Sequence, residues 1–243
     1  MGEKGVCLVI GAGDGLGGAI AKAFAAHGHP VVVTRRARHL DQLEALARDI
    51  GPHAHAFGVD ARSEEETAGL FDRIEAEIGP LEVVVFNIGA NVRFNIRDTT
   101  ARVFTKVWEM ACFAGFLAGR EAARVMGPRA RGSILFTGAT ASMRGREGFA
   151  AFAAAKAGLR MLAQSLAREL GPEGIHVAHV VCDGAIDGVF TRSRVDEAEV
   201  AQLLADDLIL KPEDIAQSFV WLHNQPRSAW SHEVDLRPWK EQW

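Results

Sequence analysis

Short apolar runs alternate with amphipathic helical stretches along nearly the whole chain, and this alternation is the feature that most limits its fold. Strands that are apolar on both faces belong in a parallel sheet with helices packed against each side. The sequence therefore predicts an α/β, doubly wound Rossmann fold with a single parallel seven-stranded sheet. The expected strands are residues 6–10, 30–34, 53–58, 81–86, 133–137, 175–181 and 232–236.

Helical periodicity marks the segments between these runs. Ser63 stands before three glutamates and is a good helix cap, because acidic groups favour the positive end of a helix. No linker or change of composition divides the chain, so we expect one domain over residues 1–243. The expected helices cover about 15–26, 38–50, 64 onward, 100–126 (as one helix or two), 149–170, 197–209 and 212–224.

Charge and composition exclude several classes of function. The net charge is −4 and there is no long Lys/Arg run, which argues against nucleic acid or an anionic membrane as a partner. Cys7, Cys112 and Cys182 lie far apart in apolar contexts and form no CxxC pair, so they predict reduced buried residues and no metal site. No run approaches the roughly 20 apolar residues that span a bilayer. We expect a cytoplasmic protein.

A glycine-rich turn, residues 11–18, joins the first strand to the first helix. Glycines at this place let the backbone turn tightly and approach a pyrophosphate, which binds at the amino end of the helix. A glycine cluster alone is weak support, but the strand before it and the helix after it are the context that dinucleotide binding requires. The turn therefore predicts a dinucleotide-binding site.

The glycine spacing resembles the TGxxxGxG fingerprint of the short-chain dehydrogenase/reductase family, with Ile10 in place of the threonine. Further segments resemble family marks in the same order: Asp60 after the third strand, residues 87–90 (NIGA), Lys156, and the segments 174–177 and 211–216. The resemblance implies an oxidoreductase that uses NADP(H) or NAD(H). The cofactor residues that it implies are Gly11, Gly13, Asp14, Gly15, Leu16, Gly17, Arg35, Arg36, Asp60, Ala61, Asn87, Gly89, Lys156 and Gly184.

The end of the second strand bears on the choice of cofactor. An acidic residue at Thr34 would hold the ribose hydroxyls of NAD, and none is present. Arg35, with Arg36 or Arg38, can clamp a 2′-phosphate, or these arginines form a solvated helix start. Asp14 would repel a phosphate unless an arginine neutralises it. NADP(H) is therefore favoured over NAD(H).

The catalytic positions are unusual, since the chain contains no tyrosine. In the family a Tyr-x-x-x-Lys pair, a serine and an asparagine form the working set, and the tyrosine exchanges a proton with the substrate oxygen. Counting back from Lys156, Phe152 occupies the tyrosine position; Phe149 occupies the wider spacing that related enoyl reductases use. Ala139 falls at the serine position and Cys112 at the asparagine position, so only Lys156 is retained.

Other groups near these positions can be considered as substitutes. Thr140 and Ser142 carry hydroxyls, but hydroxyls of such high pKa are poor acids. Asp183 stands where the family has a proline; it either acts as an acid with a pKa raised by burial, or only caps a turn or contacts the cofactor carboxamide. His179 is interpreted as a packed core residue. Catalytic candidates are therefore Lys156 and Asp183.

Two functions remain open at this point. One is an oxidoreductase that acts on an unknown carbonyl or alcohol with altered proton transfer. The other is a catalytically inactive cofactor-binding homologue that serves as a sensor or partner subunit. Residues 185–209 match the family's variable lid over a small-molecule substrate of unknown identity, and the apolar 149–170 helix favours a homodimer or homotetramer.

Overall fold

Seven parallel strands form one sheet in the computed structural model, which describes residues 4–240. The strand order is β3-β2-β1-β4-β5-β6-β7, so the predicted doubly wound fold is confirmed. Every residue of β1, β4 and β6 is buried, as their unbroken apolar sequences predict. The strands are β1 (Val6–Ile10), β2 (Val31–Arg35), β3 (Ala54–Gly58), β4 (Leu81–Phe86), β5 (Gly132–Thr137), β6 (Ile175–Cys182) and β7 (Glu233–Leu236).

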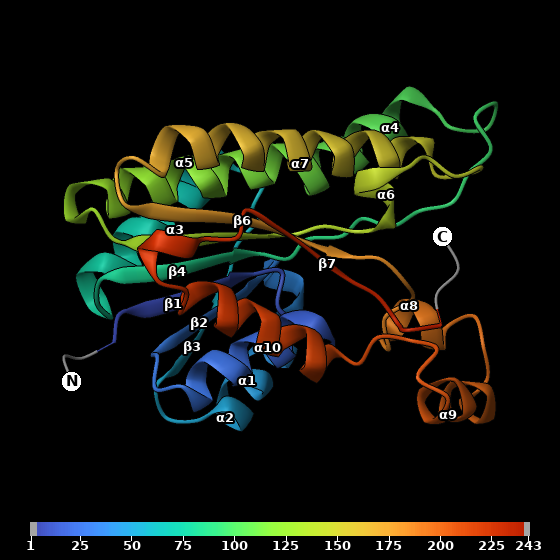
Figure 1. Cartoon of the computed structure of the whole chain (residues 1–243), viewed down its shortest axis with the longest axis horizontal. Helices are drawn as coiled ribbons and strands as arrows, with labels where there is room; N and C mark the ends of the chain where they lie inside the picture. The colour runs from blue at the N-terminus through green and yellow to red at the C-terminus, as the bar shows by residue number, and fades with distance from the viewer. Residues whose placement is uncertain (1–3, 241–243) are drawn as a thin grey trace.

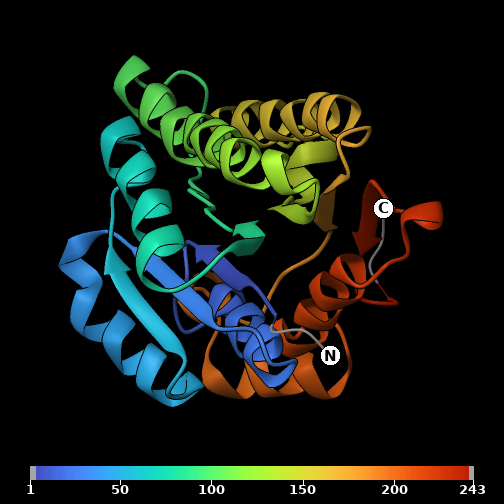
Figure 2. The ribbon, with the colours of Figure 1, turned by 90° about the vertical axis from the view of Figure 1, so that its left-hand side faces the viewer.

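Helices cover both faces of the sheet (Figure 1). One face carries α1 (Leu16–Ala26), α2 (Leu40–Ile50) and α10 (Pro212–His223). The other carries α3 (Glu64–Glu77), α4 (Ala101–Trp108), α5 (Ala114–Met126) and α7 (Ala150–Leu170), and the view turned by 90° shows the two layers on either side of the sheet (Figure 2). Three short helices lie beyond the carboxyl ends of the strands: α6 (Thr140–Met143), α8 (Val189–Arg192) and α9 (Glu197–Ala205).

The helix starts show why these segments are helical. The Ser63 side chain accepts a hydrogen bond from the Glu66 N–H, as its sequence context predicted. Thr100 and Asp196 cap α4 and α9 in the same way. Each cap satisfies an N–H group that has no partner within the helix. Among the described residues, no helix is both long enough and apolar enough to cross a membrane.

The 100–126 segment, predicted as one helix or two, is the two helices α4 and α5 joined by the π-helical turn Glu109–Phe113. One other helical prediction needs correction. The helix expected over 197–209 ends at Ala205, and Asp207 then adopts a left-handed φ of 52°. This conformation ends a helix, which apolar spacing alone does not reveal.

Close packing of α1 against the glycine turn positions the first functional element. A Cβ built on Gly17 would lie 2.6 Å from the Gly11 carbonyl oxygen and 2.8 Å from the Ala12 Cα. Both neighbours are backbone atoms, so neither can rotate away. Gly11 itself has a φ of 92°, which side-chain-bearing residues rarely adopt. The turn therefore keeps its shape only with glycine at both positions.

We expect Gly17→Ala to lower the free energy of unfolding by about 1–3 kcal/mol, because the methyl group overlaps backbone that cannot move. Gly69→Ala is the matched control: Gly69 lies in α3, and a Cβ there would meet nothing within 4 Å. The control should raise stability by about 0.8–1 kcal/mol. Urea denaturation of both variants measures the difference, and equal stability changes would contradict the packing argument.

Candidate functional site

A pocket lies where the chain leaves the carboxyl ends of β1, β2, β3 and β4. Here the strand order turns back between β1 and β4, which is where doubly wound sheets bind ligands. Seven of the predicted cofactor residues line this pocket: Gly11, Arg35, Arg36, Asp60, Ala61, Asn87 and Gly89. The other lining residues are Ile10, Thr34, His39, Val59, Arg62, Ile88, Ala90 and Met110.

The remaining predicted cofactor residues do not line this pocket. Gly13, Asp14, Gly15, Leu16 and Gly17 form the adjoining turn and the start of α1, and Lys156 lies deeper between two strand ends. Gly184 packs against the carboxyl-terminal segment, since a Cβ there would lie 2.7 Å from the Pro238 Cδ. Close packing against Pro238 thus accounts for the glycine at position 184, and this residue does not line the pocket.

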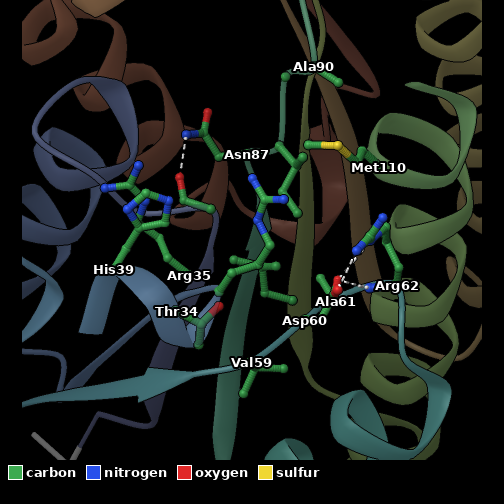
Figure 3. Close-up of a pocket in the computed structure, with 15 residues that line it drawn as sticks. Thr34, Arg35, His39, Val59, Asp60, Ala61, Arg62, Asn87, Ala90 and Met110 are labelled. Carbon is green, nitrogen blue, oxygen red and sulfur yellow. Dashed lines mark hydrogen bonds and ion pairs between the residues drawn. The ribbon is translucent and has the colours of Figure 1, made fainter. Parts of the chain in front are cut away.

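The glycine turn is tied to the strand beside it. The Asn87 side chain donates a hydrogen bond of 3.1 Å to the Gly11 carbonyl oxygen, shown as a dashed line in Figure 3. A Cβ built on Gly15 would meet no atom within 4 Å, so this part of the turn faces open space. The turn therefore fits a phosphate group approaching its backbone.

Basic side chains line facing sides of the pocket. The side chains of Arg35 and His39 lie opposite Arg62 across the pocket (Figure 3). Arg36 also lines it, and partial burial together with the neighbouring Arg38 and Arg62 holds the Arg36 pKa below its usual value. Burial is the larger cause of the lowered Arg36 pKa, and the neighbouring positive charges, which a bound anion would offset, add to it.

Arg35 extends across the glycine turn, because a Cβ on Gly13 would lie 3.2 Å from its Nη1 atom. Thr34 is buried, and no acidic side chain replaces it at the end of β2. Within residues 4–240 no ion pair joins Asp14 to an arginine, so the neutralisation of Asp14 considered from the sequence is absent from this structure.

Asp60 has a partner that the sequence analysis missed. Arg62 donates to both carboxylate oxygens, at 2.9 and 2.5 Å, and these bonds hold the Asp60 pKa below its usual value. Arg62 Nη1 also lies 3.9 Å from a carboxylate oxygen of Glu109. The close spacing of Asp60 and Arg62, two positions apart in the sequence, was the feature that could have predicted this ion pair. The pair places Asp60 at the pocket wall as a carboxylate.

Lys156 is buried in α7 and reaches the ends of two strands. Its ammonium group donates to the carbonyl oxygens of Ile88 at 2.9 Å and Thr137 at 2.8 Å. Burial lowers the Lys156 pKa to about 8. An ammonium group has three donors, so one N–H remains for a ligand. That donor fits a ribose hydroxyl of a cofactor, which is the role predicted for this lysine.

The predicted tyrosine, serine and asparagine positions come together, but as an apolar cluster. Phe152 and Cys112 are buried in it and Ala139 packs against it. Burial raises the pKa of the Cys112 thiol, so this sulfur stays protonated. Phe149, at the alternative spacing, packs against the same cluster. None of these four side chains can exchange a proton with a substrate oxygen at neutral pH.

Asp183 differs from the expectation of an acid with a raised pKa. It is fully buried, and its carboxylate accepts hydrogen bonds from Thr140 Oγ1 at 2.7 Å and from both terminal nitrogens of Arg144 at 2.9 and 3.0 Å. Burial alone raises the pKa, but these donors and the charge of Arg237 outweigh it, so the net pKa is lowered. The expectation of a raised pKa was wrong because Arg144, in the loop that precedes α7, was not recognised as the partner of this carboxylate.

The two nearby hydroxyls are also engaged. Thr140 donates to Asp183, and the Ser142 hydroxyl accepts the Ala139 N–H at 3.1 Å. His179 lies fully buried in β6, as interpreted from the sequence, with its Nδ1 3.0 Å from the Glu233 carboxylate. At this end of the site Asp183, Thr140 and Ser142 thus already have partners, whereas the buried His179 Nε2 and Thr137 Oγ1 have no hydrogen-bond partner among the described residues.

Comparison with known proteins agrees with the site geometry. The family model described as enoyl-(acyl carrier protein) reductase matches residues 11–231. The 3-oxoacyl-[acyl-carrier-protein] reductase MabA of Mycobacterium avium is 35% identical over 199 residues, which are 81% of this chain and 72% of that protein.

Two solved structures extend the comparison. A short-chain dehydrogenase from Rhodopseudomonas palustris is 46% identical with a TM-score of 0.81, and the match covers 97% of this chain and 99% of that one. A metagenomic short-chain oxidoreductase in complex with NADP is 26% identical with a TM-score of 0.80, over 96% of both chains. The chain therefore belongs to the short-chain dehydrogenase/reductase family.

Proposed function

We propose that this protein is an NADP(H)-dependent oxidoreductase of its family that acts on a small carbonyl compound or alcohol without a tyrosine proton donor. The observation that carries the proposal is the contrast between the two ends of the site. At one end the glycine turn, Asn87, the arginines and the remaining Lys156 donor suit a nicotinamide dinucleotide. At the other end Phe152 and Ala139 offer no proton.

Each part of the chain has a distinct task in this proposal. The bound nicotinamide would supply the hydride. Arg35 and Arg36 would hold the 2′-phosphate, the glycine turn the pyrophosphate, and Lys156 the nicotinamide ribose. Protons would exchange with water, and losing a positioned general acid typically slows a reaction by ~10²–10⁴-fold. The NADP complex of the metagenomic relative supports the choice of cofactor class.

A second candidate is a cofactor-binding sensor or partner subunit without turnover. The pairing of Asp183 favours it, because both carboxylate oxygens are bonded to Thr140 or Arg144 and the group is buried. A carboxylate held in this way does not deliver a proton at neutral pH. The two candidates share the cofactor site and differ only in whether hydride leaves the cofactor.

We also propose a homodimer or homotetramer, formed through α4, α5 and α7. Phe104, Trp108 and Phe116 are each about 40% exposed and Met161 is 49% exposed on these helices. Aromatic side chains exposed together on packed helices are typical of subunit interfaces. Stacking of Phe113 between Trp108 and Phe116, at 6.0 and 6.1 Å, makes this surface continuous.

The cofactor prediction is tested with Arg36→Ala. NADPH should bind the wild-type protein more tightly than NADH, and the variant should lose at least about tenfold in NADPH affinity, since a charge-assisted contact contributes ~1.5–3 kcal/mol. Its NADH affinity should change less than about twofold, because NADH has no 2′-phosphate. Arg38→Ala is the control, because Arg38 belongs to the same basic segment but does not line the pocket. Titration by tryptophan fluorescence measures the NADPH and NADH affinities of the wild type and both variants. Tighter binding of NADH than of NADPH by the wild type would refute the predicted preference for NADP(H).

The proton-donor prediction is tested with the double variant Phe152→Tyr/Ala139→Ser. With NADPH and a panel of aldehydes and ketones, the wild type should be slow and the double variant faster by ~10²-fold or more in kcat/KM. Phe149→Tyr is the control, since it adds a phenol at the other spacing and should give no gain. NADPH binding with no wild-type turnover across the panel would select the sensor instead.

The oligomer prediction is tested with Phe116→Glu, which places a charge in the proposed interface. We expect the wild-type assembly to dissociate into smaller species at micromolar concentration, because a buried unpaired carboxylate is costly. Trp221→Glu is the control: Trp221 is 52% exposed on α10, outside this surface. Size-exclusion chromatography with light scattering gives the masses, and a monomeric wild type would disprove the prediction.

A further inference from the structure

A second cluster of side chains, two histidines and a glutamate, lies at the amino ends of the strands, whereas the cofactor pocket lies at their carboxyl ends. His29 directly precedes Pro30 and β2, Glu82 is the second residue of β4, and His223 ends α10. These residues gather where β2 and β4 begin. One donor atom from each lies within 4.8 Å of the others.

One hydrogen bond of the His29 side chain fixes which of its ring nitrogens keeps a free lone pair. Its Nδ1 lies 2.8 Å from the Gly5 carbonyl oxygen, and a carbonyl can only accept. Nδ1 therefore carries the proton, and in the neutral ring Nε2 keeps a lone pair. Metal-binding histidines are typically oriented in this way, by a backbone carbonyl on the nitrogen that does not bind the metal.

His223 is held in a similar arrangement. Its Nδ1 lies 2.9 Å from the hydroxyl of the buried Ser133, and its Nε2 lies 4.0 Å from the Glu82 carboxylate. Phe24 packs edge-on against both imidazoles, at 5.5 and 5.9 Å, and the two imidazole centroids are 5.2 Å apart. Both rings thus have partners at Nδ1 that limit their rotation, and the His223 Nε2 has a free lone pair when its Nδ1 donates to the Ser133 hydroxyl.

Glu82 is a buried carboxylate that lies among cations. The Gly5 N–H donates to its Oε2 at 2.7 Å, and Arg131 pairs with its Oε1. The Arg131 side chain is 69% exposed, so it can turn to solvent without losing buried contacts. Lys4 adds positive charge nearby. A cation at the cluster would compete with Arg131 for this carboxylate.

We propose that His29 Nε2, His223 Nε2 and Glu82 bind one Zn²⁺ ion, with water in the fourth position. Two imidazoles and one carboxylate are a ligand set that zinc uses in proteins, at bond lengths of about 2.0–2.2 Å. Tetrahedral ligands at such bond lengths lie roughly 3.3 Å apart, so small side-chain rotations bring the three atoms into range. The ion would join the start of β2, the start of β4 and the end of α10, and its effect would be to stabilise the fold.

Zinc titration of the tag-free protein after removal of metal with EDTA tests the proposal. Calorimetry should show one Zn²⁺ per chain, with a rise in Tm. His223→Gln and Glu82→Gln should each weaken binding at least tenfold and abolish the rise in Tm. His55→Gln, an exposed histidine in β3, should bind like the wild type. Absence of stoichiometric wild-type binding, or an equal loss in the control, would overturn the site.

Two further variants keep all three ligands and so remain informative if a ligand variant does not fold. Ser133→Ala should weaken zinc binding by ~10-fold, because outer-shell partners of ligating histidines contribute about 10–100-fold. Arg131→Ala should strengthen it several-fold by removing the competing cation. Co²⁺ in the wild type should give the intense visible bands of tetrahedral coordination. A six-coordinate Co²⁺ spectrum, or zinc affinity unchanged in both variants, would refute the proposal.

Discussion

Burial of one positive charge organises the cofactor site. The Lys156 ammonium is almost fully removed from solvent, and such a group is stable only with strong partners. The carbonyl oxygens of Ile88 and Thr137, which follow and end neighbouring strands, supply two of them. The lysine thereby links α7 to the carboxyl ends of β4 and β5. The third donor of the ammonium has its direction set by the other two, which preorganises it for a ligand hydroxyl.

The charge of Lys156 also explains why a phenylalanine at the family's tyrosine position matters for proton transfer. In the family the lysine depresses the pKa of a neighbouring phenol, and Phe152 leaves it no phenol to act on. Phe152, on the same helix as Lys156, packs with Cys112 in an apolar cluster, which lowers the local dielectric constant and adds to the cost of burying the ammonium. Asp183 does not compensate, because its carboxylate is bonded to Arg144 and Thr140. Under the proposed function, the site would keep the groups that bind the cofactor and would lack the tyrosine proton donor of the family.

Much of this arrangement could be predicted from the sequence, because it depends on patterns among residues that are close together in the chain. Apolar runs and glycine positions are properties of neighbouring residues, so the strands and the turn at Gly11 were predicted correctly. Asp60 and Asn87, which the family resemblance implied, line the pocket. The Arg144–Asp183 pair was missed, because 39 residues separate its members and only the tertiary structure joins them. The π-helical turn at Glu109–Phe113 was also missed, since apolar spacing does not distinguish it from a regular helix.

A parallel sheet has two chemically different edges, and the histidine cluster shows that both can gather polar residues. The residues that follow the strands meet at one edge and those that precede them meet at the other, whatever their separation in sequence. His29, Glu82 and Ser133 all stand at or near strand starts, so the topology that assembles the cofactor pocket also assembles this cluster. The five residues of β1 span about 16 Å at ~3.3 Å per residue. Over that distance a cation at the amino edge would act on the cofactor site only through the stability of the sheet that both edges share.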